Sequence, residues 1–424
     1  MGKKKKEFTI RSIRLDKLVH GGQALAILDN GKKLFVWGGL PGEVVSVRVL
    51  KQKKTYVEGV VVEVLEPSID RVEPEEPESY LSTSPWQIMT FDCENNAKQE
   101  ILEESFTREG VDGIEFREFV SDDNKYGYRN KMELGFWGNE EGLHLAHYVR
   151  GSHGKTIVEG SELAKGCINN AARDIRDELN RLEVWGGKLK TVVLRASKDD
   201  SVVAALFIKE ELDLNGFKLP GSLKGLDVYY SNPKSPASVA TKKLYSFGDI
   251  KLTDSVNGIN IMYDVMSFFQ VNLSVFELAL QEIQKQLKGK NIVDMYSGVG
   301  TIGVVVGANK LVESDENNVQ MATENVKDKK TDVIHASSET AIEEITSETI
   351  IILDPPRAGL HKKVIERITE VRPPQIVYLS CNPSTQARDV KLLEEFYDIS
   401  FARGYNFFPR TPHIESLIVL ELKK

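Results

Sequence analysis

Cysteine is scarce in this chain, with three residues among 424. Cys93, Cys167 and Cys381 are too few and too scattered to build a disulfide framework, so the sequence favours a reducing compartment such as the cytoplasm. Long apolar runs are also lacking. No run reaches the roughly 18 residues that a membrane span needs. The lysine-rich start at residues 1–6 is not followed by an apolar core, so no signal peptide is expected.

An excess of positive charge is absent as well. The net charge is −8, which argues against a wholly basic nucleic-acid binder. The charge is uneven, however: residues 1–66 carry 13 basic and 7 acidic side chains, a net of +6, and the remainder carries −14. A basic amino-terminal module on an acidic body predicts an arm that docks RNA. For Lys3–Lys6 alone, a solvated tail is an equally good interpretation.

Three segments differ in their pattern. Residues 1–66 alternate apolar and polar residues in short runs between glycine turns, which predicts a small β-barrel. Residues 66–79 are rich in proline and glutamate and indicate a linker. Residues 67–262 form a mixed β-rich domain, whose helical part near 92–124 could pack on the catalytic domain. In residues 263–424 strands alternate with helices, which predicts an α/β domain with a mostly parallel sheet.

A glycine-rich turn follows the first strand of that α/β domain. The sequence Asn291–Gly303 reads as a strand, a turn with Gly298 and Gly300, and a helix start. Glycines there let the backbone approach a ligand. The next strand ends at Glu313, whose carboxylate can accept both hydroxyls of a ribose. These features suit NAD and S-adenosylmethionine alike.

Two later strand ends distinguish those cofactors. Asp354-Pro355-Pro356 is typical of methyltransferases that act on nucleobases, and a Rossmann dehydrogenase has no use for it. Cys381 follows the apolar run 376–379 and precedes the breaker Asn382-Pro383. A thiol at a strand end of an open α/β sheet is placed where such sheets bind ligands, and cysteine is a strong nucleophile once ionised.

The motifs Phe268–Asn272, Asp294–Gly300, Asp354–Gly359, Ser380–Pro383 and Thr411–Ser416 occur in this order. This set resembles the RNA uracil-C5 methyltransferase family, whose members make 5-methyluridine in ribosomal or transfer RNA. The resemblance implies a class I (Rossmann-like) methyltransferase domain. The barrel is similar to the OB-like TRAM domain, and the β-rich segment is similar to the family's central RNA-binding domain. Because TRAM domains occur on many ribosomal-RNA members, 23S rRNA is favoured over tRNA as substrate, and a monomer is expected.

The resemblance also implies roles for single residues. Cys381 would be the nucleophile and Glu415 the general base. S-adenosylmethionine would be bound by Gln270, Tyr296, Glu313 and Asp354, with Thr301 and Ser337 as weaker candidates. Asp354 and Arg357 could contact the uracil edge or orient the loop. Phe268 and Phe269 could stack on the base or fill the core, and we expect at least one of them in the core.

The sequence departs from this family in one respect. Many members carry an iron–sulfur cluster in the central domain, held by closely spaced cysteines. The corresponding stretch here, Tyr80–Met89, contains no cysteine, and Cys167 alone cannot hold a cluster. We therefore predict no cluster and no other metal.

Two other functions stay open at this point. One is a methyltransferase that acts on a base amino group and uses Asp354-Pro355-Pro356 as its amine clamp. Arg357 argues against it, because that position usually carries an aromatic residue. The other is a catalytically silent RNA-binding homologue, against which the presence of both Cys381 and Glu415 argues.

Overall fold

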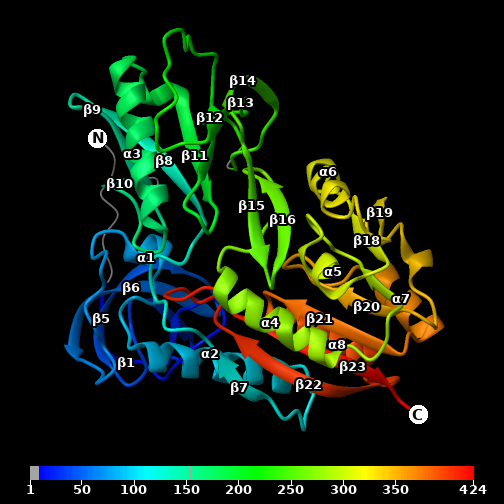
Figure 1. Ribbon diagram of the computed structural model, residues 1–424. Coiled ribbons are helices and arrows are strands. Elements are labelled where there is room, and N and C mark those ends of the chain that lie inside the picture. The colour runs from blue at the N-terminus through cyan, green and yellow to red at the C-terminus, as the bar shows by residue number, and fades with distance from the viewer. Residues whose placement is uncertain (1–8, 153, 236) are drawn as a thin grey trace. The chain divides into compact units, whose positions relative to one another are not determined.

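The computed structural model describes residues 9–152, 154–235 and 237–424 (Figure 1). The lysine tail at residues 3–6 therefore lies outside the described residues. The chain divides into two compact units. Unit 1 contains residues 1–101, 147–156 and 408–413, and unit 2 contains residues 102–146, 157–407 and 414–424. Among the described residues, no helix combines the length and the apolar character that crossing a membrane requires.

A six-stranded barrel dominates unit 1. Its strands are β1 (Thr9–Arg14), β2 (Lys17–Leu18), β3 (Ala24–Ile27), β4 (Lys33–Trp37), β5 (Val44–Gln52) and β6 (Tyr56–Glu66), in the order β1-β5-β6-β4-β3-β2. Alternate residues such as Leu34, Val36 and Val47 point inward and are fully buried. Gly59 is required where β5 and β6 approach, because a Cβ there would lie 2.3 Å from Val47 Cγ1. The predicted barrel is thus formed by the predicted alternation.

The segment after the barrel is fastened to it. Residues 67–79, predicted as a linker, contain no helix and no strand in this part of the structure. Arg71 nevertheless pairs with the buried carboxylate of Glu43 at 2.5 Å and donates to the carbonyl of Gly38 at 2.9 Å. The short helix α1 (Tyr80–Thr83) and the start of α2 (Phe91–Arg108) follow.

A buried ionic cluster organises the rest of unit 1. Lys98 of α2 donates to Glu94 at 2.8 Å and to the carbonyl of Phe408 at 3.0 Å. The backbone N–H of Arg410 donates to the same Glu94 carboxylate at 3.0 Å. Burial lowers the pKa of Lys98, so its charge depends on these partners. The cluster holds residues 408–413 in place within this unit.

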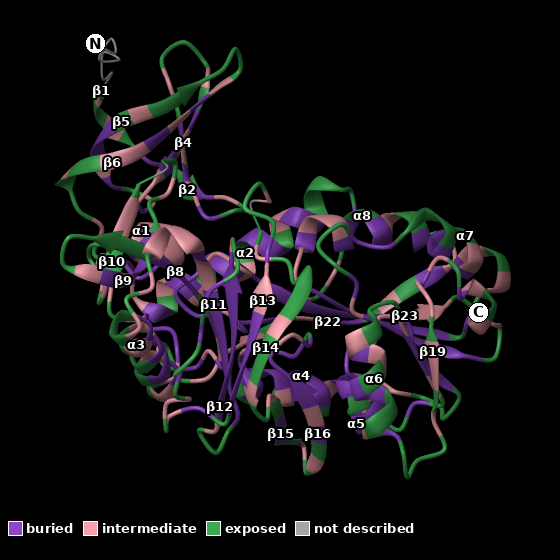
Figure 2. Cartoon of the chain, turned by 90° about the horizontal axis from the view of Figure 1, so that it is seen from above, coloured by how far each residue is buried: buried purple, intermediate pink, exposed green. Residues whose placement is uncertain are grey.

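Unit 2 contains a seven-stranded sheet backed by one helix. Its order is β10-β9-β8-β11-β12-β13-β14, and α3 covers one face. The elements are β8 (Lys131–Asn139), β9 (Gly142–Tyr148), β10 (Lys155–Val158), α3 (Gly166–Arg181), the 3-10 turn η1 (Gly186–Lys188), β11 (Leu189–Ala196), β12 (Val202–Ile208), β13 (Gly225–Tyr230) and β14 (Lys242–Gly248). Strands β11 and β12 are buried almost throughout, as Figure 2 shows.

A second, eight-stranded sheet in unit 2 has the order β19-β18-β17-β20-β21-β23-β22-β7. Its strands are β7 (Arg117–Val120), β17 (Ile292–Asp294), β18 (Lys310–Glu313), β19 (Asp332–His335), β20 (Ile350–Leu353), β21 (Gln375–Ser380), β22 (Tyr397–Tyr405) and β23 (Glu415–Leu422). Its helical segments are α4 (Leu273–Gln286), α5 (Thr301–Val306), α6 (Glu316–Asn325), the 3-10 turn η2 (Ile342–Glu344), α7 (Lys362–Val371) and α8 (Pro383–Leu393). The first five strands of the order are parallel, as expected, whereas β23 runs antiparallel to β21.

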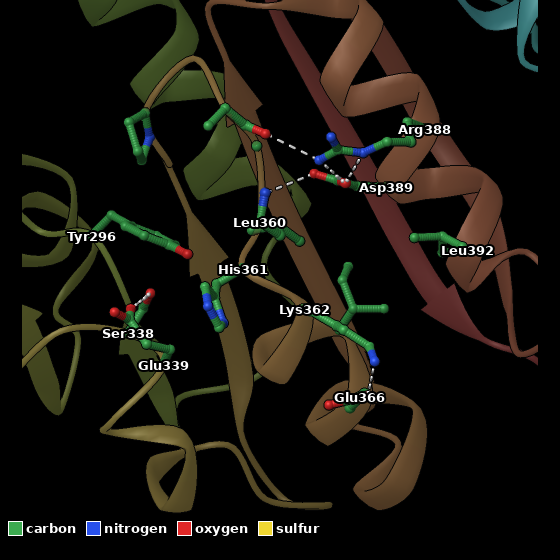
Figure 3. A pocket seen from close by; sticks show the side chains of 14 residues that line it. Tyr296, Ser338, Glu339, Leu360, His361, Lys362, Glu366, Arg388, Asp389 and Leu392 are labelled. Atoms are coloured by element: carbon green, nitrogen blue, oxygen red, sulfur yellow. Dashed lines mark hydrogen bonds and ion pairs between the residues drawn. The ribbon is translucent and has the colours of Figure 1, made fainter.

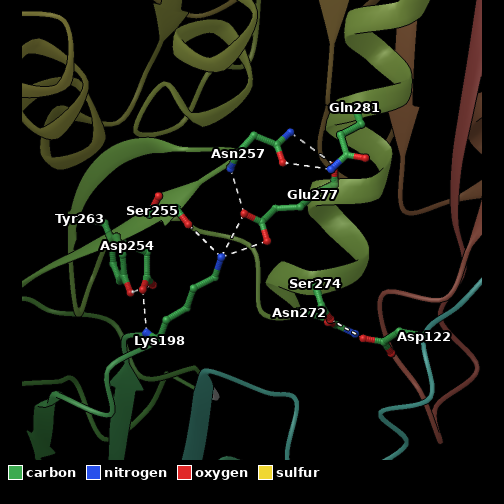
Figure 4. Close-up of polar contacts among 10 residues, drawn as sticks. All are labelled: Asp122, Lys198, Asp254, Ser255, Asn257, Tyr263, Asn272, Ser274, Glu277 and Gln281. Atoms are coloured by element: carbon green, nitrogen blue, oxygen red, sulfur yellow. Dashed lines mark hydrogen bonds and ion pairs between the residues drawn. The ribbon is translucent and has the colours of Figure 1, made fainter.

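The hairpin β15 (Lys251–Val256) and β16 (Ile259–Asp264) leads into α4, and one lysine ties these parts together (Figure 4). Lys198 lies in the turn between β11 and β12. Its ammonium donates to the carbonyl of Ser255 at 2.8 Å and pairs with Glu277 of α4 at 2.9 Å. This contact fixes the start of α4, which directly follows Gln270.

Candidate active site

The nucleophile candidate and the base candidate lie on neighbouring strands. Strands β21 and β23 are antiparallel, and Ser380 faces Ser416 in their register. The next step of that register places Cys381 opposite Glu415. Both residues lie at the edge of the sheet where the parallel strands end, and Asp354 follows β20 at the same edge. The sheet thus brings together three residues that lie far apart in the sequence.

The electrostatics of these side chains confirm that they lie close together. Burial, together with the charges of Glu415 and Asp354, raises the pKa of the Cys381 thiol to about 12. Burial and Asp354 hold the pKa of Glu415 well above its usual range. Burial, with a contribution from Asp294, raises the pKa of Asp354 to about 7. Near neutral pH, this group of acids therefore holds more protons than it would in water.

Arg357 opposes these shifts. The charge of its guanidinium lowers the pKa of the Cys381 thiol and that of Glu415. Arg357 therefore favours the ionised forms on which nucleophilic attack and proton removal depend.

Helix α8 holds the loop that carries Arg357. The Asn382 side chain donates to the carbonyl of Arg357 at 2.8 Å. Asp389 is buried and accepts the backbone N–H of Leu360 at 2.8 Å. Arg388 donates to the carbonyl of Ala358 at 3.1 Å, as Figure 3 shows. The loop is therefore fixed at Arg357 and at the residues that follow it.

The glycine turn is built to receive a ligand. Gly298 and Gly300 have φ of +56° and +88°, which favours glycine. The Glu313 carboxylate accepts the backbone N–H of Gly298 at 2.8 Å, so it lies beside the turn. Within the described chain, the buried hydroxyl of Ser297 has no hydrogen-bond partner. An unsatisfied buried hydroxyl next to a glycine turn and a carboxylate fits a polar cofactor such as an adenosine derivative.

The loop before α4 carries Gln270. Asn130 donates to the backbone carbonyl of Gln270 at 2.9 Å, so the loop position is fixed and the side chain is nearly buried. Phe269 is buried and its ring stacks on Tyr263, with centroids 4.0 Å apart. Phe268 is 59% exposed and lies next to Gly298. The prediction that one of the two phenylalanines fills the core is thus confirmed.

Tyr296 lies apart from Glu313 on the lining of a pocket of about 740 Å³ (Figure 3). Ser338 and His361 line the same pocket, and burial raises the pKa of the Tyr296 hydroxyl. Ser338 and His361 were not predicted as site residues. The predicted strand end at Asp354 was the available signal for His361, because loops that follow parallel strands meet at one edge of the sheet. Strand β19, which precedes Ser338, was not predicted. Ser337 instead bonds to Thr340 at 3.1 Å.

A parallel sheet with a glycine turn after its first strand, an acidic residue at the end of the second and Asp-Pro-Pro after the fourth is a class I methyltransferase fold. The sequence profile of the tRNA (Uracil-5-)-methyltransferase family matches residues 90–423, and that of the TRAM domain matches residues 4–62. The chain belongs to this family. It is an S-adenosylmethionine-dependent RNA (uracil-5-)-methyltransferase with an amino-terminal TRAM barrel.

Relatives and a solved structure agree with this assignment. An uncharacterized RNA methyltransferase of Fusobacterium nucleatum is 26% identical over 98% of this chain and 96% of its own. One of Clostridium tetani is 29% identical over 93% of each chain. The structure is similar to that of Pyrococcus abyssi tRNA (uracil-54, C5)-methyltransferase in complex with S-adenosyl-L-homocysteine. That match has a TM-score of 0.78 and 24% identity and covers 97% of this chain and 100% of the other, which supports the fold.

Proposed function

We propose that this enzyme methylates C5 of one uridine through a covalent bond between Cys381 and C6 of the base. The observation that supports the proposal is the β21–β23 register, whose last pair, Ser380 and Ser416, lies directly beside Cys381 and Glu415. The thiol gives its proton to the Asp354 carboxylate, which leaves the Glu415 carboxylate free, and its sulfur bonds to C6. Electrons of the C5–C6 double bond move toward C5, which takes the methyl group. Glu415 then accepts the C5 proton, and the C6–S bond breaks to restore the double bond.

We propose that Gln270, Tyr296, Glu313 and Asp354 hold S-adenosylmethionine, which supplies the methyl group. Glu313 beside the Gly298 turn suits the ribose hydroxyls, and the pocket at Tyr296 suits a planar ring. Asp354 follows β20, which pairs on one side with β17, the strand that ends at Asp294, and on the other with β21, the strand that precedes Cys381. This position lets it face both the cofactor and the base.

We propose 23S rRNA as the substrate rather than tRNA, on the basis of the TRAM barrel. The Pyrococcus abyssi protein of similar fold acts on tRNA, so the choice needs a direct test. Mapping of 5-methyluridine in the rRNA and tRNA of cells with and without this enzyme decides it. A lost modification in tRNA alone would contradict the proposal. We further propose that the enzyme acts as a monomer in the cytoplasm, where its three free thiols stay reduced.

The covalent step can be tested by trapping. RNA that carries 5-fluorouridine at the target should form a stable adduct with the enzyme, because fluorine cannot leave as a proton. Cys381→Ala should abolish the adduct. Cys167→Ala is the matched control, because Cys167 lies on α3 and bonds to Asp200, and it should trap RNA normally. An adduct of equal yield in Cys381→Ala would rule out the assigned nucleophile.

A further inference from the structure

The outer face of the barrel carries aromatic rings among lysines. Strand β4 alternates strictly: Leu34 and Val36 are fully buried, so Phe35 points to the outside. Strand β6 runs parallel to β4, and Tyr56 faces Lys33 across the pair. The rings of Phe35 and Tyr56 are in edge contact, with centroids 6.0 Å apart. Two aromatic rings thus lie side by side on the outer surface of the sheet.

Lysines surround these rings. The ammonium of Lys51 lies 5.6 Å from the centre of the Tyr56 ring. The turn between β3 and β4 touches the turn between β5 and β6, because Lys32 donates to the carbonyl of Lys53 at 3.5 Å. This contact brings the exposed Lys53 and Lys54 to the end of the barrel where Tyr56 lies. We call the residues Lys33, Phe35, Lys51, Lys53, Lys54 and Tyr56 the lysine–aromatic face.

The neighbouring part of the sheet is already occupied. Trp37 also points outward from β4, but the Arg150 guanidinium stacks on its ring at 3.9 Å. Arg150 is itself bound to the backbone of residues 81 and 82. Glu58 neutralises part of the charge, since it pairs with Lys51 at 3.0 Å. The open part of the sheet is therefore limited to the end at Phe35 and Tyr56.

We propose that the lysine–aromatic face binds an unpaired segment of the substrate RNA, with bases stacked on Phe35 and Tyr56 and phosphates contacted by the lysines. Phe35 and Tyr56 are half-buried, and outward-facing rings on an OB-like barrel can stack only on bases that are free of a double helix. Lysines around the rings provide the charge complementarity to the RNA backbone. The proposal rests on the proposed RNA methyltransferase function and assigns to the barrel a contact with bases, beyond attraction to phosphate.

The test measures binding of a short oligouridylate and of an RNA duplex of equal length to the full-length protein at several salt concentrations. The double variant Phe35→Ala/Tyr56→Ala should bind oligouridylate about ten-fold more weakly, because a stacked base contributes about 1–3 kcal/mol. Its salt dependence should stay unchanged, since no cation is lost. The double variant Lys53→Ala/Lys54→Ala should instead have a flatter salt dependence: the slope of log affinity against log salt concentration should decrease in magnitude by about one. Duplex binding should respond to the lysine variant alone.

Two further variants control the interpretation. Tyr56→Phe keeps the ring and should bind normally. Val62→Ala removes an exposed apolar side chain from the same strand and should have no effect. If the double alanine variant unfolds, Tyr56→Leu, which keeps apolar cover, replaces it. Unchanged oligouridylate affinity in the ring-deficient variant would overturn the proposal.

The outcome is separable from the catalytic proposal. At saturating RNA, the ring-deficient variant should still form the 5-fluorouridine adduct. An adduct missing from the unmodified enzyme would defeat the covalent mechanism, whatever the binding data show.

Discussion

Burial of Cys381 disfavours the thiolate form of its side chain, which the reaction needs. With its pKa near 12, the thiol carries its proton in the free enzyme at neutral pH, although only the thiolate attacks C6. The two carboxylates that raise this pKa are also the nearest proton acceptors. The positive charge of Arg357 stabilises the thiolate. The site therefore holds the thiol in its protonated form and places beside it the groups that can ionise it.

Glu415→Gln should separate methyl transfer from proton removal. Glutamine is nearly isosteric but cannot accept the C5 proton, so the methylated base should stay bonded to Cys381. We expect turnover to fall by at least about 100-fold, within the range for loss of a general base. A protein–RNA complex that carries labelled methyl should accumulate on a denaturing gel. Near-normal turnover would move the base to another group, such as a water held by Asp354.

The pH dependence of adduct formation should reflect the carboxylates rather than the thiol alone. Asp354 has a pKa of about 7, and below that pH it is protonated and cannot accept the thiol proton. The rate should therefore rise about ten-fold per pH unit below pH 7 and level off above it. The inflection belongs to the coupled pair of Asp354 and Glu415.

A matched variant makes this test specific. Asp354→Asn removes the acceptor, so its much lower rate should rise steadily with pH, without a plateau above pH 7. A plateau that persists in this variant would show that another group takes the proton. The rates are measured as single-turnover adduct formation with 5-fluorouridine RNA at saturating concentration.

At the scale of elements, the alternation of strands and helices predicted the parallel strands β17, β18, β20 and β21 closely, because each is a short apolar run bounded by turn residues. It did not predict that β23 inserts antiparallel beside β21, nor that β7 joins the far edge. Periodicity identifies a strand but gives neither its neighbours nor its direction. Cys381 and Glu415 lie close together because of that pairing. Their proximity could therefore be predicted from the sequence only through the family resemblance.

The loop held by α8 can be tested at Gly359. This residue has φ of +81°, and a Cβ there would lie 2.6 Å from both Arg388 Nη2 and Asp389 Oδ2. Gly359→Ala should push the loop away from α8 and displace Arg357. We expect adduct formation to slow by at least about ten-fold, because misplacement of a charged group by about 1 Å is costly in catalysis. Rates and thermal stability are measured together.

Gly307→Ala is the control for backbone strain. Gly307 ends α5 with φ of +75°, and a Cβ there would meet no atom within 4 Å. Both substitutions place alanine in the left-handed region, at a cost of about 1–2 kcal/mol in stability. Only Gly359→Ala should also lose the adduct rate. Equal rate losses in both variants would mean that strain, and not the contact with α8, governs the site.

At the scale of the whole molecule, composition predicted a basic barrel and an acidic body but not how the barrel is anchored. Proline and glutamate made residues 66–79 read as a linker, yet Arg71 forms a buried ion pair with Glu43 of the barrel. A single arginine in an acidic stretch gives no signal of its partner 28 positions earlier. For the same reason, the cluster of Glu94, Lys98 and Arg410 was not foreseen, since Arg410 lies 316 positions after Glu94.

The last prediction concerns metal. The stretch Tyr80–Met89 has no cysteine, and within unit 1 its place is filled by Trp86, Gln87 and Met89, which are buried. The Trp86 indole N–H donates to the carbonyl of Gly22 at 3.0 Å, so packing and hydrogen bonds hold this region. Enzyme purified without oxygen should be colourless and contain no stoichiometric iron by elemental analysis. It should also keep its activity after treatment with a chelator. Iron that copurifies in whole-number ratio and disappears in Cys93→Ala or Cys167→Ala would show that a cluster does form in this chain, with ligands other than the usual closely spaced cysteines.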